Sequence, residues 1–267
     1  MTLLSHEPAI RLGVFLAMLA AMAAWELAAP ARRAEVPHLI RWSNNLALVV
    51  IDTAVLRLVL PVLAVGAAVW AQAQGIGLLH LAPLPGWLAV VLAILALDLA
   101  IYGQHILMHK TPALWRLHRM HHADPLVDVT TGLRFHPLEI LLSMLLKIAL
   151  VVSLGAPPVA VLLFEVILNA ASLFNHANIR LPPRVEALAR LILITPDLHR
   201  IHHSEIRAET DSNYGFSVPW WDRLFRTFRA RPALGPDGVV AGIGAFGTAR
   251  DQWLDRLLIQ PFRRPGA

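Results

Sequence analysis

Long apolar segments separated by short polar ones dominate the pattern of this chain. Five segments stand out: residues 10–29, 46–71, 86–109, 138–154 and 159–173. About 20 apolar helical residues cross the core of a bilayer, and the first three segments reach that length. The last two are shorter and are separated by Gly155-Ala156-Pro157-Pro158, so they predict a helical hairpin that spans the membrane or dips into it. The pattern predicts an all-α, polytopic membrane helical bundle with about four to five membrane helices.

Polar residues inside these segments fall on defined helical faces. Asp52 and Arg57 interrupt the second segment. Charges at membrane depth usually face the protein interior and need partners, so we expect this segment to pack inside the bundle. In the third segment, polar residues at positions i, i+4, i+7 and i+11 form one stripe: Asp98, Tyr102, His105 and His109. This stripe delivers two histidines to the end of a membrane helix.

Two copies of one histidine cluster follow, each with the pattern HxxHH. They are His118-Arg119-Met120-His121-His122 and His199-Arg200-Ile201-His202-His203. Residues at i, i+3 and i+4 share one face of a helix, so each cluster can aim three imidazoles at one point. Thr111-Pro112 and Thr195-Pro196 precede the clusters with an N-cap residue and a first-turn proline, which predicts two short capped helices.

Together with His105 and His109, the clusters contribute eight histidines. This number exceeds the four ligands of a structural zinc site and suits two metal ions with positions left open for a small molecule. The alternative is that these are ordinary surface or core histidines. The recurring spacing favours metal, because imidazole is the commonest metal ligand.

Composition narrows the chemistry further. The chain has 57% hydrophobic residues and no cysteine, against a usual apolar share of roughly 45–50% in globular proteins. The absence of cysteine excludes disulfides, thiolate iron–sulfur sites and Cys-type zinc sites, so His, Asp, Glu or Asn must hold any metal. The formal charge of +5 comes from Arg-rich tracts beside apolar segments. It indicates membrane-flanking charge and no nucleic-acid partner.

The positive charges also predict an orientation. Arg32, Arg33 and Arg41 lie between the first two segments, and Lys110, Arg116 and Arg119 follow the third. Positively charged loops stay in the cytoplasm, so we expect the histidine-rich helical cap on that side. We divide the chain into N-terminal membrane helices (1–85), a catalytic region (86–230) and a C-terminal cytoplasmic tail (231–267).

Further residues are candidates for the site. His176 lies at the cytoplasmic end of the predicted hairpin and could supply a ninth ligand, whereas His136 precedes Pro137 and either caps the next helix or binds metal. Several carboxylates could accept hydrogen bonds from ligand N–H groups: Asp98, Asp124, Asp128, Glu139, Asp197, Glu205, Glu209 and Asp211. Asp124 and Asp197 could equally be helix caps.

Five motifs carry a resemblance to a known family. They are Asp98-x3-Tyr102-x2-His105-x3-His109, the two HxxHH clusters, Arg134-Phe135-His136-Pro137-Leu138-Glu139, and Glu209-Thr210-Asp211-Ser212-Asn213-Tyr214-Gly215. This set resembles the fatty acid hydroxylase superfamily, and within it the bacterial sterol desaturase-like proteins. The resemblance covers about residues 95–230 and is highly specific.

The resemblance implies an integral membrane di-iron oxygenase, in the bacterial inner membrane with its active site on the cytoplasmic side. Such an enzyme hydroxylates or desaturates a lipid of the fatty acyl, sterol-like or isoprenoid kind with O2. We find no cytochrome b5-like or flavin segment in this sequence. Electrons from NAD(P)H would therefore arrive through a reductase and a separate carrier of the ferredoxin or cytochrome b5 type.

The resemblance also assigns residues. The three histidine boxes of the family bind the metal, which carries over to His105, His109, His118, His121, His122, His199, His202 and His203. Related membrane hydroxylases have one more histidine between the second and third boxes, and His176 occupies that interval. Within the matching motifs we expect catalytic or ligand-orienting roles for Asp98, Tyr102, Glu139, Asp211 and Asn213.

Two other functions remain open at this point. A histidine-rich membrane metal transporter would place its ligands midway through the spans, whereas these histidines lie near helix ends. A zinc-dependent membrane hydrolase would need an open zinc position with a general base nearby. Oxygen consumption with lipid distinguishes all three functions.

Overall fold

The structure is a computed structural model and describes residues 3–81 and 83–264. Within these ranges all regular elements are helical, and one isolated β-bridge joins Ser204 to Ala241. The prediction of an all-α fold is therefore confirmed.

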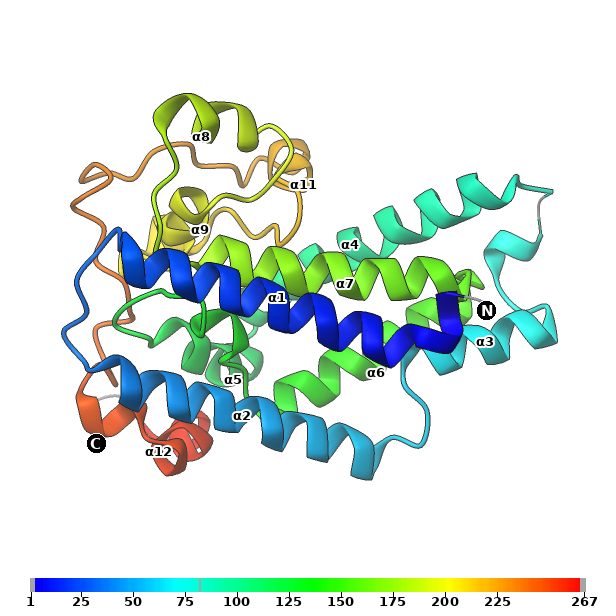
Figure 1. Cartoon of the computed structure of the whole chain (residues 1–267), viewed down its shortest axis with the longest axis horizontal. Coiled ribbons are helices and arrows are strands. Elements are labelled where there is room, and N and C mark those ends of the chain that lie inside the picture. The colour runs from blue at the N-terminus through cyan, green and yellow to red at the C-terminus, as the bar shows by residue number, and fades with distance from the viewer. Residues whose placement is uncertain (1–2, 82, 265–267) are drawn as a thin grey trace.

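Six of the helices form an elongated bundle (Figure 1): α1 (Glu7–Ala28), α2 (His38–Val59), α3 (Ala64–Gln74), α4 (Gly86–Lys110), α6 (Pro137–Leu154) and α7 (Pro158–His176). Five helical stretches are long and apolar enough to cross a membrane: Leu3–Ala28, His38–His80, Gly86–Lys110, Pro137–Leu154 and Pro158–His176. Large apolar side chains such as Leu12, Val50 and Leu58 are exposed on these helices. A polytopic membrane bundle explains both the composition and this exposure.

The second apolar segment differs from the prediction of one continuous helix over residues 46–71. Helix α2 ends at Val59 and α3 begins at Ala64, with Pro61 between them. Proline lacks the N–H that a helix needs and clashes with the preceding turn, so the helix cannot continue through it. Asp52 is buried as expected, but Arg57 is exposed in the last turn of α2.

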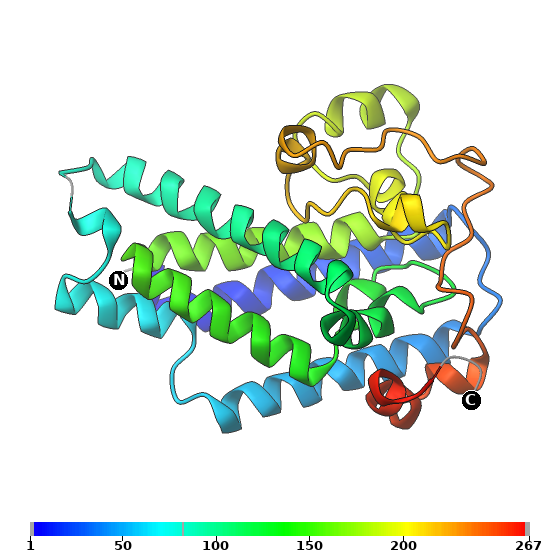
Figure 2. The same ribbon diagram turned by 180° about the vertical axis from the view of Figure 1, so that it is seen from behind.

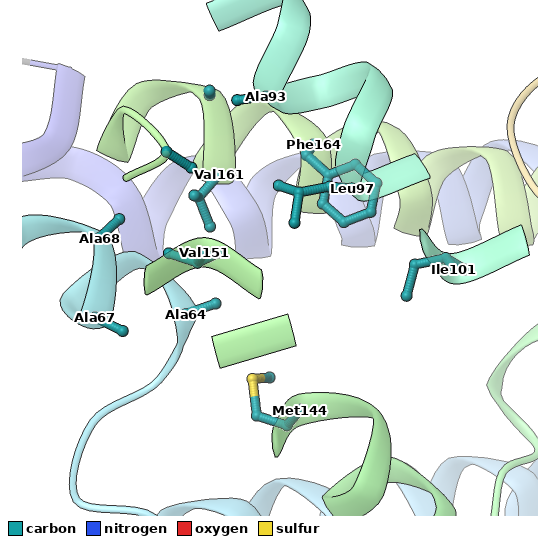
Figure 3. Close-up of a cluster of buried hydrophobic side chains, with 12 residues drawn as sticks. Ala64, Ala67, Ala68, Ala93, Leu97, Ile101, Met144, Val151, Val161 and Phe164 are labelled. Carbon is teal, nitrogen blue, oxygen red and sulfur yellow. The ribbon is translucent and has the colours of Figure 1, made fainter. Parts of the chain in front are cut away.

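Helix α3 packs back against α6 and α7. Its contact face consists of small side chains, among them Ala64, Ala67 and Ala68, which let helix backbones approach closely. Figure 3 shows these alanines beside Val151 of α6 and Val161 of α7. This apolar core joins the helices at the end of the bundle that is distant from the histidines.

A cap of short helices covers the opposite end of the bundle (Figures 1 and 2). Its α-helices are α5 (Pro112–His122), α8 (Pro183–Ala189), α9 (Pro196–His202), α10 (Arg207–Thr210), α11 (Trp220–Leu224) and α12 (Leu254–Ile259). The start of α1 and the α12 region lie at opposite ends of the molecule.

The predicted C-terminal tail is a packed part of this cap. Residues 249–262 form two 3-10 turns around α12 and contact α2 and α5. Arg119 donates a hydrogen bond of 2.7 Å to the carbonyl of Gln260, and Arg134 donates one to the side chain of Gln252. Arg119 lies in α5, and Arg134 donates a hydrogen bond of 2.8 Å to the carbonyl of Met120 in the same helix, so the end of the chain supports the first histidine cluster from outside.

Candidate metal centre

Both HxxHH clusters lie on short helices that begin at a proline, as the sequence predicts. The first is on α5, which starts at Pro112, and the second on α9, which starts at Pro196. The hydroxyl of Thr195 caps α9 by accepting a hydrogen bond from the backbone N–H of Leu198 at 3.4 Å. Thr111 holds the same position before α5 but makes no capping bond, so this part of the prediction was wrong.

The structure brings nine buried histidines together in two sets. The ligand atoms of each set lie within 4.8 Å of one another: His105, His109, His118, His122 and His202 in the first set, and His121, His176, His199 and His203 in the second. Helices α5 and α9 each contribute to both sets. The nine are the histidines that the sequence singled out, including His176.

The Nδ1 atoms of four of these rings donate hydrogen bonds to oxygen acceptors. His118 donates to a carboxylate oxygen of Glu139 at 2.7 Å. His105, His202 and His176 donate to the carbonyls of Tyr214, Ser212 and Ser172 at 2.6 to 2.7 Å. A neutral imidazole carries one proton, so each of these rings presents a bare lone pair at Nε2.

These lone pairs point at one another. The Nε2 atom of His105 is 3.1 Å from the Nε2 atoms of both His118 and His202. In the second set, Nε2 of His176 lies 3.1 Å from that of His121 and 2.9 Å from that of His199. In the first set no proton lies between these Nε2 atoms, so their lone pairs repel one another. A cation bound between them removes this repulsion. The donor set therefore fits two metal ions.

Electrostatics keep the cap histidines neutral. Burial, reinforced by neighbouring imidazoles, holds the pKa of His199 and of His203 well below the ordinary value. Burial lowers the pKa of His202 to about 3. A neutral imidazole is the form that binds metal, so these rings are ready ligands at neutral pH.

Two of the predicted carboxylates contact the histidines. Glu139 accepts the proton of His118, as described above, and its second oxygen Oε2 has no hydrogen-bond partner. An oxygen of Asp211 lies 3.6 Å from Nδ1 of His109, while Lys110 and Arg207 each donate to the other oxygen at 2.8 Å. These two carboxylates lie where ligand orientation requires them.

Asp98, Tyr102 and Asn213 lie one step further from the histidines. Asp98 accepts a hydrogen bond of 2.8 Å from Trp221, and the hydroxyl of Tyr102 bonds that of Thr227 at 2.8 Å. Both bonds tie α4 to the segment that follows α10.

Asn213 shapes the loop that reaches the rings. It has a left-handed backbone with φ of 51°. Its side chain donates to the carbonyls of Leu198 and Arg229 at 3.2 and 2.9 Å and accepts from the N–H of Arg229 at 2.8 Å. The residues on either side, Ser212 and Tyr214, supply the carbonyls that His202 and His105 bind.

His136 is a helix cap. Its Nδ1 accepts from the N–H of Leu138 at 3.2 Å at the start of α6, and Nε2 bonds the carbonyl of Leu258 at 3.1 Å. His136 belongs to neither histidine set. Of the two roles left open by the sequence, capping is the one the structure supports.

Asp124 and Asp128 are buried partners of Arg41 rather than caps or ligand contacts. Arg41 donates two bonds of 2.8 Å to Asp124 and another to Asp128. Burial opposes ionisation of Asp124, but the guanidinium groups of Arg41 and Arg134 outweigh it and hold its pKa below the ordinary value. The network fixes the chain directly after His122.

The remaining predicted carboxylates make structural contacts elsewhere. Asp197 pairs with Arg200 at 2.5 Å within α9. Glu205 accepts from the N–H of Gly244 at 3.2 Å, and Glu209 accepts from that of Ala233 at 2.5 Å. These three side chains hold the cap together and contact none of the nine histidines among the described residues.

A cavity of about 490 Å³ opens beside the first histidine set. It runs between helices α1, α2, α4, α6 and α7, and His105 and His118 form part of its wall. Phe135, Phe216, Leu133 and Met108 line the region around them. Its volume suits a small-molecule or lipid ligand, since such pockets measure roughly 300–1,000 Å³.

The sequence did not predict the backbone carbonyls that accept the Nδ1 protons of the histidines. Ser172, Ser212 and Tyr214 act through backbone oxygens, which every residue possesses and which therefore leave no residue-type signal. The spacing Asn213-Tyr214-Gly215 was the one available signal, since Asn and Gly favour unusual backbone angles.

Comparisons with known proteins agree with this site. The model of the family described as fatty acid hydroxylase matches residues 90–227, more than half of the chain. Ornithine lipid hydroxylase of Rhizobium tropici is 34% identical over 177 residues, 66% of this chain and 51% of that protein. Human alkylglycerol monooxygenase is 29% identical over 161 residues, 60% of this chain and 35% of the human protein.

Cholesterol 25-hydroxylase of Rattus norvegicus is 25% identical over 145 residues, 54% of this chain and 47% of the rat protein. The chain spans about half of the ornithine lipid hydroxylase and about a third of the alkylglycerol monooxygenase. No solved structure matches the chain. The matched region, residues 90–227, contains all nine clustered histidines, and the chain belongs to the fatty acid hydroxylase family.

Proposed function

We propose that this chain is a membrane-bound, O2-dependent lipid hydroxylase with two non-haem iron ions. The observation that carries the proposal is the paired histidine centre that opens to a cavity between membrane helices. In the reaction a C–H bond of the lipid breaks and a C–OH bond forms. The second oxygen atom leaves as water, using two electrons and two protons from outside.

The two histidine sets are the proposed metal sites. One ion would be held by His105, His109, His118, His122 and His202, and the other by His121, His176, His199 and His203. When bound, the ions supply O2 activation, which no protein side chain provides. Iron fits this chemistry better than zinc, although affinity alone favours zinc or copper in an overexpressed sample.

The protein positions the ligands. Glu139 holds the Nδ1 proton of His118, and the carbonyls of Ser212 and Tyr214 do the same for His202 and His105. Asp211 supports His109 from 3.6 Å. Three further residues act indirectly, because they fix the segment that carries these carbonyls: Asp98, Tyr102 and Asn213. Such supporting contacts orient rings and raise ligand basicity.

The cavity gives a lipid access to the histidines. Its wall passes between membrane helices, so a lipid can reach His105 and His118 from within the bundle. Relatives named as ornithine lipid hydroxylase, alkylglycerol monooxygenase and cholesterol 25-hydroxylase support a lipid substrate. Hydroxylation is the outcome those names share, and we propose it ahead of desaturation.

Electrons would enter from the cytoplasm. We propose a ferredoxin or cytochrome b5 type of carrier with an NAD(P)H reductase, because the described chain contains no cysteine that could hold an iron–sulfur cluster. The positive charges that flank α1, α2 and α4 favour a cytoplasmic cap and, in a bacterium, an inner-membrane location.

The test begins with the purified full-length chain from iron-rich cells. Elemental analysis should find about two iron ions per chain, since nine imidazoles overfill one site. With lipid extract, carrier and reductase, O2 uptake should match the appearance of a hydroxylated lipid in mass spectra. His121→Ala and His202→Ala should lose metal and activity but still insert into the membrane, because hydropathy drives insertion.

His6→Ala is the matched control, since His6 lies in the turn before α1 and belongs to neither histidine set. Lipid turnover that needs neither O2 nor reductant and works equally well with zinc would overturn the proposal and favour a hydrolase. A reproducible metal content near zero would contradict the assigned ligands.

A further inference from the structure

The cavity beside the histidines carries an unusual number of polar side chains for a space between membrane helices. On α6, Glu139, Ser143 and Lys147 follow at i, i+4 and i+8 and form one stripe along the wall. On the facing side of the cavity, α2 contributes Asp52 and Thr53. A cavity for a plain hydrocarbon tail would need none of these groups, and burying them costs free energy unless they are paired.

Most of the cavity's charges are balanced within the protein. Lys147 donates to Glu165 at 2.8 Å. Arg11 lies between Glu7 at 2.8 Å and Glu165 at 3.1 Å. Arg57 also lines the cavity, from the last turn of α2, but its residue is exposed. Lys147 and Arg11 are therefore neutralised, and Arg57 is not among the groups that act on Asp52 through space.

Asp52 is the exception. Its residue is only 7% exposed, and its Oδ1 has no hydrogen-bond partner. The charged group that acts on it through space is Glu139, a second carboxylate, whose Oε2 is also buried without a partner. Each of these two carboxylates therefore has one buried oxygen without a hydrogen-bond donor, and both line the same cavity.

We infer that Asp52 binds the ammonium group of an amine-bearing lipid, so that the head-group end of the substrate enters the cavity. A primary ammonium carries one positive charge and three N–H donors, which suits the unpartnered Oδ1 of Asp52 beside a second carboxylate, Glu139. The inference deepens the proposed function, because it names the substrate class for the same cavity.

The arrangement also predicts which part of the lipid reacts. Glu139 neighbours the ammonium site and bonds His118 at 2.7 Å, and His118 and His105 line the same cavity. A lipid held by its ammonium group at Asp52 thus presents carbons near that group to the histidine centre. The hydroxyl group should appear on the head-group end and not near the methyl end of an acyl chain.

Binding of simple amphiphiles tests the inference without turnover. The full-length chain in a neutral detergent is titrated with hexadecylamine and with hexadecanol, which differ in charge but share the alkyl chain. The amine should bind at least about tenfold more tightly. Asp52→Asn should remove that preference and leave hexadecanol binding unchanged, while Asp52→Glu should restore part of it. Asp255→Asn, an exposed carboxylate change, is the control.

Equal binding of amine and alcohol by the wild-type chain would overturn the inference, and this comparison needs no variant to fold. A loss of both ligands in Asp52→Asn, with the chain still monodisperse, would contradict a specific ammonium contact. Iron content and O2 uptake are measured on the same samples. If the amine preference fails while both persist, the proposed function stands and only the substrate class falls.

Discussion

At the scale of single residues, the metal centre depends on where ring protons go. Glu139 and three backbone carbonyls accept the Nδ1 protons of His118, His105, His202 and His176. Each acceptor leaves Nε2 free and directed inward. Glu139 is the one acceptor among these four that a substitution can alter directly, because the others are main-chain atoms.

Glu139→Gln should lower lipid turnover by about 10- to 100-fold, with a smaller loss of iron than His121→Ala causes. The amide still accepts the proton of His118 but no longer carries the negative charge that strengthens the ring as a ligand. Initial rates and iron content of the purified variant measure both effects. Glu35→Gln, at an exposed position, should change neither. A variant with full activity would show that the Glu139 charge has no part in the reaction.

At the scale of elements, short loops hold the candidate metal centre between the helix bundle and the cap. The loop around Asn213 delivers two carbonyls to the first histidine set while its own side chain bonds to Leu198 and Arg229. Its φ of 51° lies in the left-handed region, which raises the free energy of a non-glycine residue unless local hydrogen bonds offset it. Conformation and side-chain bonding at this position can be separated by substitution.

Asn213→Gly should keep the left-handed backbone without strain and lose only the side-chain hydrogen bonds. Asn213→Ala should lose the same hydrogen bonds and in addition strain the backbone. We expect the alanine variant to be less stable than the glycine variant by about 1 kcal/mol, the cost of a left-handed residue with a Cβ atom. Thermal unfolding in detergent measures the difference. The opposite order of stabilities would contradict the role of backbone strain at this site.

The buried Arg41 network is a second element-level contact, because it joins α2 to the segment that follows α5. Arg41→Met leaves the carboxylates of Asp124 and Asp128 buried without that partner, which should cost about 3–5 kcal/mol. Thermal inactivation and iron retention should both worsen. Arg57→Met on the same helix removes an exposed charge that has no ion-pair partner among residues 3–81 and 83–264, and should have little effect on either measurement.

The sequence predicted the parts of this molecule that repeat or that follow a helical period. The histidine spacing singled out eight rings, and His176 was added from its position at a helix end and from the family resemblance; the structure brings all nine together in two adjacent sets. The sequence did not predict contacts between distant segments, such as those of Asp98 with Trp221 and of Arg41 with Asp124. A hydropathy pattern indicates which residues are buried, but it does not indicate which residues they contact. The break at Pro61 carried a signal, but the apolar run on both sides outweighed it in the prediction.

At the scale of the whole molecule, the cap lies at one end of the bundle and the loop between α3 and α4 at the other (Figure 2). Positive residues gather at the cap end of α1, α2 and α4. Reporter fusions after residues 35 and 125 should therefore both report the cytoplasm, and a fusion after Gln74 the opposite side. Signals from opposite sides for the first two positions would contradict the proposed orientation. The reporters read topology alone and are independent of metal loading.

The sharing of α5 and α9 between the two histidine sets has a consequence for how the protein would load metal. His118 and His122 belong to one set and His121 to the other, while the second cluster, on α9 and its C-cap residue, gives His202 to the first set and His199 and His203 to the second. An ion in either set fixes both helices and so lowers the ordering cost for the second ion. Uptake should then be cooperative. A sample with half the full iron content should appear in native mass spectra as a mixture of empty and doubly loaded chains, with few singly loaded ones.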